Sequence, residues 1–436
     1  MTTAASPPFV CHGCGAAVDI ARRLPFACPN AGVPGDDTDH VLVAPADVRG
    51  LAPGEELNPF LRYRAWLSPY RLARAAGLPD DAWAELVGEL DAALLAIEGH
   101  GFRITPTTRQ PALARALGLA RDLWIKDETG AVSGSHKARH LAGVMLYLRV
   151  LEAAGLPLGD GLRGRRLAIA SCGNAALAAA VIARAAQWPL DVFIPADAEP
   201  AVVRRLRELG AAITVCERRA GDGGDPCVRA FRRAVEGGAV PFGVQGPDNG
   251  LAIEGGRTLA FEMAEEFGRN GVAVGALFVQ VGGGALASAL AQGFAMAAAA
   301  GVLPRRPRLL AVQTAGCAPL ARAWQRLSGV ALAEAARHRS RFMWPWETTP
   351  VSLAHGILDD ETYDWWEAAQ AMRETDGGVV VAGEAALERA HALARAHTGI
   401  QASVTGTAGL AGVTAIAGRS DETLAAVFSG VERADA

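Results

Sequence analysis

Gly134-Ser135-His136-Lys137-Ala138-Arg139 is the segment around which the rest of the chain is organised. It contains one of the two lysines in a chain whose Lys and Arg residues together number 42. An amine, unlike a guanidinium, can lose its proton near neutral pH and attack a carbonyl to form a Schiff base. Gly134 and Ser135 offer backbone N–H groups and a hydroxyl, and an apolar helix pattern follows. A phosphate bound at that helix start would lie close to the Lys137 amine.

The other basic residues near this stretch have simpler interpretations. Lys126, the second lysine, is flanked by Asp127 and Glu128, and we interpret it as a salt-bridge partner. Three arginines precede it in a segment that leads toward Lys137: Arg62, Arg64 and Arg71. They form either a solvated basic face, which we favour, or a binding site for an anionic substrate.

Composition narrows the class of protein. Half of the 436 residues are hydrophobic and 50 are glycine, which suits close-packed α/β architecture. A net charge of −4 does not suggest a nucleic-acid partner. The start of the chain lacks the pattern of a secretory signal, and no long uncharged apolar run indicates a membrane span. Seven scattered cysteines indicate a reducing compartment, so we expect a soluble, cytoplasmic protein.

The N-terminal segment, residues 1–48, has the spacing of a zinc ribbon. Cys11-x-x-Cys14-Gly directs two thiolates at one tetrahedral ion, and Cys28 supplies a third. Ala31 stands where the fourth thiolate belongs, and His40 is the best replacement by type and distance. The other candidates for the fourth ligand are His12, Asp36, Asp37 and Asp39. Two alternatives remain: a bound zinc ion, or a decayed ribbon that folds without metal.

Strand and helix patterns alternate along the rest of the chain. Predicted strands cover 123–128, 166–170, 191–195, 212–216, 277–281 and 309–313, with another after Gly378; predicted helices cover 80–95, 175–186, 200–209, 254–267 and 385–397. Alternation of this kind predicts parallel, right-handed βαβ units. We predict a loop at 221–225 and a turn at 405–407 before a final helix. Residues 328–366 are irregular and rich in tryptophan, and we expect them to form a lid, a dimer surface or a packed satellite of the core.

Two glycine-rich turns connect strand patterns to helix patterns and present free backbone N–H groups to an anion. They are Ser171–Asn174 and Gly282–Ala287. The second turn also fits Gly-x-Gly-x-x-Ala, the dinucleotide fingerprint of oxidoreductases. That function requires an acidic residue at the end of the next strand, but the strand ends Val312-Gln313-Thr314. It would also leave Lys137 without a role, so we reject it.

The order of these motifs resembles the pyridoxal-phosphate enzymes of the tryptophan-synthase-β fold, known as fold type II. The motifs are Ser-x-Lys-x-Arg at 135–139, Ser-x-Gly-Asn at 171–174, Gly-Gly-Gly at 282–284 and the late threonine turn. The ribbon and the segment Ile253–Glu262 look like threonine synthase within that group. The resemblance implies an α/β protein of two lobes, with parallel sheets flanked by helices. We expect a large cofactor-binding lobe from 49–135 and 241–436, and a small mobile lobe from 136–240.

The resemblance also assigns roles to matching residues. Lys137 would hold pyridoxal phosphate as an internal aldimine and then move the α-proton of the substrate. Phosphate contacts would come from His136, Gly282, Gly283, Gly284 and Ala285. Asn174 would bond the ring hydroxyl, and Thr405 would face the pyridine nitrogen. The amino-acid substrate would contact Ser171, Cys172, Gly173, Ala175 and Arg139. A homodimer is the implied assembly.

The reaction is less defined than the cofactor, because the lysine motif departs from the threonine synthase pattern. His136 resembles the tryptophan synthase β subunit, and Ala138-Arg139 is closer to Ser/Thr dehydratases. We predict a carbon–oxygen lyase similar to threonine synthase, which needs a second anion site for which Arg139, Arg62 and Arg64 are candidates. The alternatives are a dehydratase, a β-replacement synthase that uses another O-substituted amino acid, and an inactive ligand-binding relative.

Overall fold

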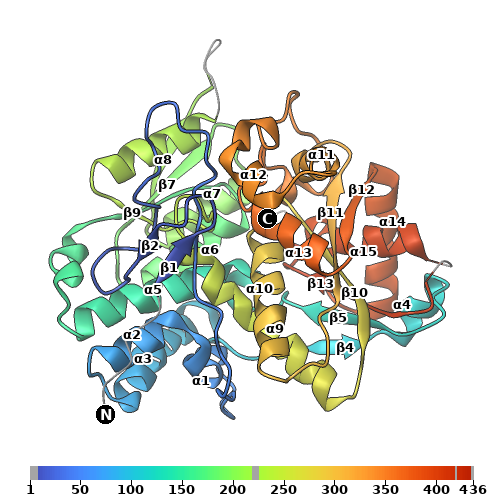
Figure 1. Ribbon diagram of the computed structural model, residues 1–436, viewed down its shortest axis with the longest axis horizontal. Helices are drawn as coiled ribbons and strands as arrows, with labels where there is room; N and C mark the ends of the chain where they lie inside the picture. Colours follow the sequence, from blue (N-terminus) through green and yellow to red (C-terminus); the bar gives the residue numbers. More distant parts are fainter. Residues whose placement is uncertain (1–7, 219–224, 418–419, 434–436) are drawn as a thin grey trace.

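The computed structural model describes residues 8–218, 225–417 and 420–433, and three sheets organise this part of the chain (Figure 1). The six-stranded sheet has the order β12-β11-β10-β13-β5-β4, in which only β4 is antiparallel to its neighbour. The four-stranded sheet, β8-β7-β6-β9, is parallel throughout. A small antiparallel sheet, β2-β1-β3, lies in the N-terminal segment.

The strands are β1 (Phe9–Cys11), β2 (Ala17–Val18), β3 (Leu42–Val43), β4 (Thr107–Arg109), β5 (Leu123–Asp127), β6 (Leu167–Ala170), β7 (Leu190–Pro195), β8 (Ala212–Cys216), β9 (Val240–Pro241), β10 (Val274–Gln280), β11 (Arg308–Thr314), β12 (Gly378–Ala382) and β13 (Thr423–Phe428). The helices are α1 (Pro59–Arg62), α2 (Ser68–Ala75), α3 (Asp80–Glu98), α4 (Pro111–Ala116), α5 (Lys137–Ala153), α6 (Asn174–Ala185), α7 (Pro200–Glu208), α8 (Pro226–Glu236), α9 (Ala252–Arg269), α10 (Ala285–Ala299), α11 (Pro319–Arg326), α12 (Leu332–Arg337), α13 (Trp365–Glu374), α14 (Glu384–Thr398) and α15 (Val404–Ile416).

The predicted α/β class and its parallel sheets are confirmed, and the two glycine-rich turns belong to different sheets. The Ser171–Asn174 turn follows β6 of the four-stranded sheet, whereas Gly282–Ala285 follows β10 of the six-stranded sheet. Both turns lie at carboxyl ends of parallel strands, where α/β proteins bind ligands.

Sequence analysis missed β13, which lies between β10 and β5 at the centre of the large sheet. The prediction of a turn at 405–407 was wrong. Thr405, Gly406 and Thr407 form the first turn of α15, where the Ser403 hydroxyl accepts a hydrogen bond of 3.0 Å from the Gly406 N–H. A capping serine can begin a helix without a separate turn.

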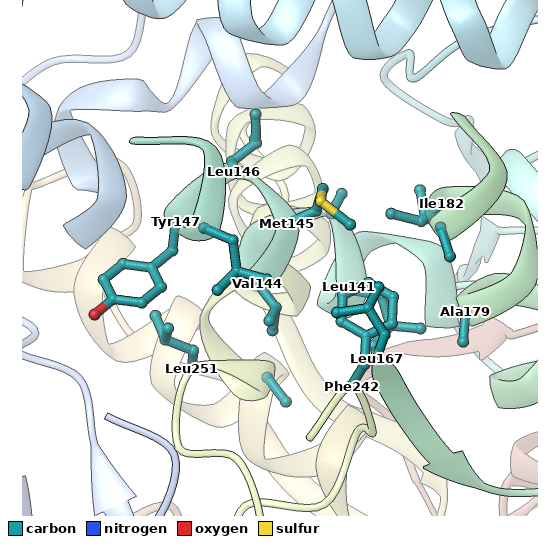
Figure 2. Packing of buried hydrophobic residues seen from close by; sticks show 14 of the residues in the cluster. Leu141, Val144, Met145, Leu146, Tyr147, Leu167, Ala179, Ile182, Phe242 and Leu251 are labelled. Atoms are coloured by element: carbon teal, nitrogen blue, oxygen red, sulfur yellow. The ribbon is translucent and has the colours of Figure 1, made fainter. Parts of the chain in front are cut away.

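Helix α5, which begins at Lys137, is apolar on nearly every face and is therefore buried. Figure 2 shows Leu141, Val144 and Met145 of α5 among side chains of the four-stranded sheet, α6 and the 242–251 segment. Helices α2 and α3 join the same core, although we placed their residues with the larger lobe. The lobe boundaries stay a prediction.

The large sheet is covered on both faces, as parallel sheets require. Helices α9, α10, α11 and α13 share one apolar cluster with β10 and β11, and α4, α14 and α15 share another with β5, β10 and β13. Trp365, in the segment that we interpreted as irregular, is fully buried in the first cluster. Trp344 and Trp346 lie instead over Arg322, with 3.7 and 5.3 Å between the guanidinium carbon and the ring centroids.

Among the helices of the described residues, none is by itself both long and apolar enough to cross a membrane. The predicted loop at 221–225 lies outside the described residues except for Asp225, the N-cap of α8.

Candidate active site

Lys137 is the first residue of α5, and a constrained loop positions it. Ser133 and Gly134 both have left-handed backbone conformations, with φ of 57° and 69°. The loop then joins the end of β13, because the His136 N–H donates to the Ser429 carbonyl over 3.1 Å. Burial lowers the pKa of Lys137, and the charges of Asp359 and Asp364 oppose that change. A larger fraction of this amine is therefore uncharged at a given pH than for an ordinary lysine.

Two buried polar atoms beside Lys137 have no hydrogen-bond partner among the described residues: the Ser135 hydroxyl and His136 Nε2. Buried polar groups are normally hydrogen-bonded, so orphaned atoms next to a reactive amine indicate a place for a polar ligand. His136 Nδ1 lies 3.0 Å from the Ser429 carbonyl and must be the donor there. Burial holds the pKa of His136 well below its ordinary value. A phosphate contact by His136 stays a prediction, since neutral Nε2 is an acceptor.

The Gly282–Gly284 turn leads from β10 into α10 and already holds an anionic group. A Cβ atom at Gly282 would collide with Asp359 Oδ2, and one at Gly283 would lie 3.6 Å from it, so the Asp359 carboxylate lies directly against the turn. Burial raises the pKa of Asp359, whereas the charge of Lys137 opposes that change. The carboxylate stands where the helix dipole and free N–H groups favour negative charge. The turn therefore fits a phosphate group.

The Ser171–Ala175 turn faces the lysine loop through Asn174, the first residue of α6. Asn174 Oδ1 accepts a 2.8 Å hydrogen bond from Arg433, near the end of the described chain. The predicted substrate contacts in this turn are accessible: Cys172 is exposed, and Ser171, Gly173 and Ala175 are half-buried. Their contact with a substrate stays a prediction.

Two hydroxyls lie at the carboxyl end of the large sheet, and sequence reasoning found only one. Thr405 Oγ1 accepts a 3.1 Å hydrogen bond from the Gly356 N–H. The missed residue is Ser429, which follows β13 directly. Its N–H bonds the Gly406 carbonyl over 3.1 Å, and its hydroxyl lies 2.5 Å from Gln280 Nε2. A Ser-Gly pair after the apolar run 423–428 was the available signal.

The structure does not support the predicted role of Arg139 in substrate binding. Arg139 is 1% exposed, and its guanidinium bonds Glu128 Oε2 at 2.8 Å and Glu262 Oε1 at 2.6 Å. Lys126 joins this network with Nζ 2.5 Å from Glu262 Oε2, and it is fully buried. Lys126 is thus the salt-bridge partner that we expected, although with Glu262 rather than with its sequence neighbours. The Arg139 donors are used inside the protein and cannot reach a substrate.

Arg62 and Arg64, the other residues named for a second anion site, and Arg71 of the same segment are also bonded within the protein. Arg62 bonds Glu265 at 2.7 Å. Arg64 bonds Glu56 at 2.6 Å and Asp80 at 3.0 Å. Arg71 donates to two backbone carbonyls, those of Ala65 and Asp47. The three residues form neither the solvated basic face that we favoured nor an accessible binding site for an anion.

The structure brings the four predicted metal ligands together. One ligand atom from each of Cys11, Cys14, Cys28 and His40 lies within 4.8 Å of the others. The Cys14 and Cys28 sulfurs are 3.5 Å apart, and His40 Nδ1 is 3.5 Å from the Cys11 sulfur. These separations suit the edges of a tetrahedron with zinc–ligand bonds of about 2.0–2.3 Å. His40 Nε2 bonds Asp36 over 2.7 Å, the outer-shell arrangement that orients a metal-binding histidine.

Comparison with known proteins adds an independent finding. The family described as "Pyridoxal-phosphate dependent enzyme" matches residues 100–430. L-serine dehydratase of Saccharomyces cerevisiae is 30% identical over 216 residues, 48% of this chain and 60% of the yeast protein. Threonine synthase of Synechocystis is 27% identical over 311 residues, 71% of this chain and 70% of that protein. The chain thus spans less than two thirds of the length of the yeast dehydratase.

Solved structures share the fold. Maize serine racemase superposes with a TM-score of 0.59 at 18% identity, covering 80% of this chain and 94% of the racemase. The processed form of threonine deaminase isoform 2 from Solanum lycopersicum superposes with a TM-score of 0.60 at 16% identity, covering 89% of this chain and 96% of the deaminase. Identities this low establish the architecture alone.

Proposed function

We propose that this chain, which belongs to the family of pyridoxal-phosphate-dependent enzymes, binds its cofactor at Lys137 and catalyses β-elimination from a small hydroxy-amino acid. The products would be a 2-keto acid and ammonia, as expected for a Ser/Thr-type dehydratase. One observation carries the choice of reaction: each arginine that we named for a second anion site is paired within the protein.

The residues around Lys137 suit the cofactor. The Gly282–Ala285 turn would hold the phosphate, as it now holds a carboxylate. Asn174 and Thr405 would contact the ring. The bound cofactor supplies an electron sink that stabilises negative charge at the substrate's α-carbon. Lys137, whose pKa burial lowers, would hold and move the α-proton in a site screened from water.

Charge in the site favours elimination over the predicted synthase reaction. A threonine synthase must bind a phosphorylated substrate and therefore needs cations beyond those that hold the cofactor. Instead, two acidic residues, Asp359 and Asp364, lie near Lys137, and burial raises the pKa of Asp364 to about 8. A neutral β-hydroxyl leaving group requires no second phosphate site, so serine or threonine suits this environment better.

A substrate panel tests this choice. Serine, threonine, O-phosphoserine and O-phosphohomoserine would be supplied separately to the holoenzyme, and keto acid, phosphate and new amino acid would be measured. We expect keto acid from serine or threonine. Phosphate release from O-phosphohomoserine with formation of threonine, at a rate far above any keto-acid formation, would overturn the dehydratase proposal and leave the cofactor proposal intact.

Threonine synthase activity is the second candidate, because two observations favour it. The segment Ile253–Glu262 that resembles threonine synthase forms the core of α9. The Synechocystis enzyme also matches a larger share of this chain than the yeast dehydratase does, 71% against 48%.

We also propose that Cys11, Cys14, Cys28 and His40 bind one zinc ion, because their ligand atoms have tetrahedral spacing and His40 has a carboxylate partner. Metal analysis of protein purified without chelator should find about one zinc per chain. The homodimer and the cytoplasmic location stay predictions.

A further inference from the structure

Arg433 lies at the candidate active site, although no motif pointed to it. Its Nη2 atom donates to Asn174 Oδ1 and to the Ser133 carbonyl, both over 2.8 Å. Ser133 belongs to the lysine loop and Asn174 to the turn after β6. One guanidinium therefore connects the strand that ends at Phe428, the loop before Lys137 and the turn that carries Asn174.

The contact fixes which end of the Asn174 carboxamide faces the site. A guanidinium can only donate hydrogen bonds, so the atom that faces Arg433 must be the amide oxygen. The NH₂ group then points the other way. Its nitrogen lies 3.1 Å from the position that a Cβ atom on Gly430 would take, and that position is 3.3 Å from the Ser135 Cβ. The NH₂ group is thus held between the end of β13 and the lysine loop.

Within the described residues, the NH₂ group of Asn174 has no protein acceptor, and no carboxylate forms an ion pair with Arg433. The space beside the NH₂ group is free because residue 430 is glycine. An oriented donor without an acceptor, next to the loop that carries Lys137, is what a negatively charged ring oxygen requires.

We propose that Arg433 is a positioning residue that orients the Asn174 carboxamide, so that its NH₂ group donates to the deprotonated ring oxygen of the cofactor bound at Lys137. The proposal rests on the proposed function, because it requires the cofactor at Lys137. It also gives Arg433 a role apart from substrate binding: the guanidinium acts through Asn174 and does not itself touch the reacting atoms.

The test is a pH titration of the visible absorbance of the holoenzyme in four proteins: wild type, Arg433→Met, Asn174→Ala and the double variant. A donor to the ring oxygen stabilises its deprotonated form, so its loss moves the titration midpoint to higher pH. We expect Arg433→Met to raise the midpoint and to weaken cofactor binding by about tenfold, the effect of losing a charge-assisted hydrogen bond. Arg433→Lys should recover part of both, because an ammonium can still donate to the amide oxygen.

Asn174→Ala separates positioning from general stability. If Arg433 acts through Asn174, the Arg433→Met change should not move the midpoint when Asn174 is already alanine. Arg395→Met is the matched control, because Arg395 anchors the same C-terminal segment through a 3.3 Å ion pair with Glu432. It should leave the midpoint unchanged.

Two results would overturn the proposal and leave the proposed function standing: an unchanged midpoint in Arg433→Met, or the same change in the wild-type and Asn174→Ala backgrounds. If wild-type protein gains no visible absorbance from pyridoxal phosphate, both proposals fall.

Discussion

The Lys137 amine carries the proposed chemistry, and its environment determines when it can react. Attack on a carbonyl requires the uncharged amine, and burial lowers the pKa of Lys137 from 10.5. Lys126 is buried as well, but Glu262 holds its ammonium at 2.5 Å. Lys126 is fully buried and Lys137 half-buried, and burial lowers the pKa of both amines. Among the described residues only Lys126 has an ion-pair partner, so Lys137 is the more available nucleophile.

We predict that cofactor attachment to the apoprotein accelerates with pH and levels off below pH 10.5, the ordinary pKa of a lysine amine. The rate rises with pH because only the deprotonated amine attacks. It levels off below pH 10.5 because an amine with a lowered pKa loses its proton at lower pH. Stopped-flow absorbance against pH would measure the rate. Borohydride reduction followed by peptide mapping should find the label on Lys137, and Lys137→Arg should abolish it. A label on Lys126 would contradict the assignment.

Arg139 illustrates how burial changes the interpretation of a motif. Arginine after the lysine suggested a substrate contact, but both of its carboxylate partners are buried with it. We expect Arg139→Met to lower the free energy of unfolding by about 3–5 kcal/mol, because the buried Glu128 would lose its ion-pair partner and Glu262 would keep only Lys126. Urea unfolding would measure it, with Arg269→Met as the exposed control, expected to cost under about 1 kcal/mol. An unchanged unfolding free energy with a raised substrate KM would restore the substrate role.

At the scale of elements, a short segment covers the Gly282–Gly284 turn. Asp364 N–H bonds the Gly283 carbonyl over 2.9 Å, and Cβ atoms at Gly282 and Gly284 would meet Ile357, Asp359 or Thr362. The three glycines thus permit close approach of residues 357–364 as well as anion binding. Sequence analysis described this segment only as irregular, because a contact between distant parts of the chain leaves no periodic pattern.

We predict that Asp359→Asn raises cofactor affinity by at least about tenfold, because the Asp359 carboxylate lies against the turn proposed to hold the phosphate and would repel it. Equilibrium titration of the apoprotein with pyridoxal phosphate would measure the change. Asp360→Asn is the control, since the neighbouring carboxylate lies outside the turn. If Asp359→Asn and wild type bind pyridoxal phosphate with equal affinity, the turn accommodates the phosphate and the Asp359 carboxylate together, and the prediction is wrong.

The predictable elements are those with strong local patterns. Strands β5 to β8, β10 and β11 and helices α3, α6, α7, α9 and α14 were found within a few residues, because each repeats one apolar period between turn signals. Helices α8 and α11 were not predicted. Strand β13 was missed, since Leu424-Ala425-Ala426-Val427 has the alanine-rich composition of the neighbouring helices. The site followed the same rule: Lys137 and both glycine turns have local signatures, whereas the roles of Arg433, Ser429 and Asp359 depend on tertiary contacts.

At the scale of the whole molecule, the N-terminal segment ties the two large sheets together. Its Ile20 carbonyl accepts a 2.8 Å hydrogen bond from Tyr147 of α5, within the core of the four-stranded sheet. On its other side, His12 lies 3.1 Å from Glu367 of α13, which packs on the six-stranded sheet. Figure 1 shows this dark-blue segment beside the helices and strands of the smaller sheet.

Metal binding should therefore stabilise more than the ribbon. Residues 8–43 have little regular structure of their own, because they contain only three short strands of two or three residues each. The proposed zinc site joins the two ends of this segment. We expect Cys14→Ser to lose the metal, to lower the thermal midpoint of the whole protein by several degrees and to expose the segment to proteolysis. Scanning calorimetry with metal analysis would measure this. Cys216→Ser, which changes a cysteine outside the cluster, should leave both values unchanged. Suppose instead that wild-type protein, purified without chelator, contains no metal and has the same thermal midpoint as Cys14→Ser. The ribbon then holds the sheets together through its apolar contacts alone.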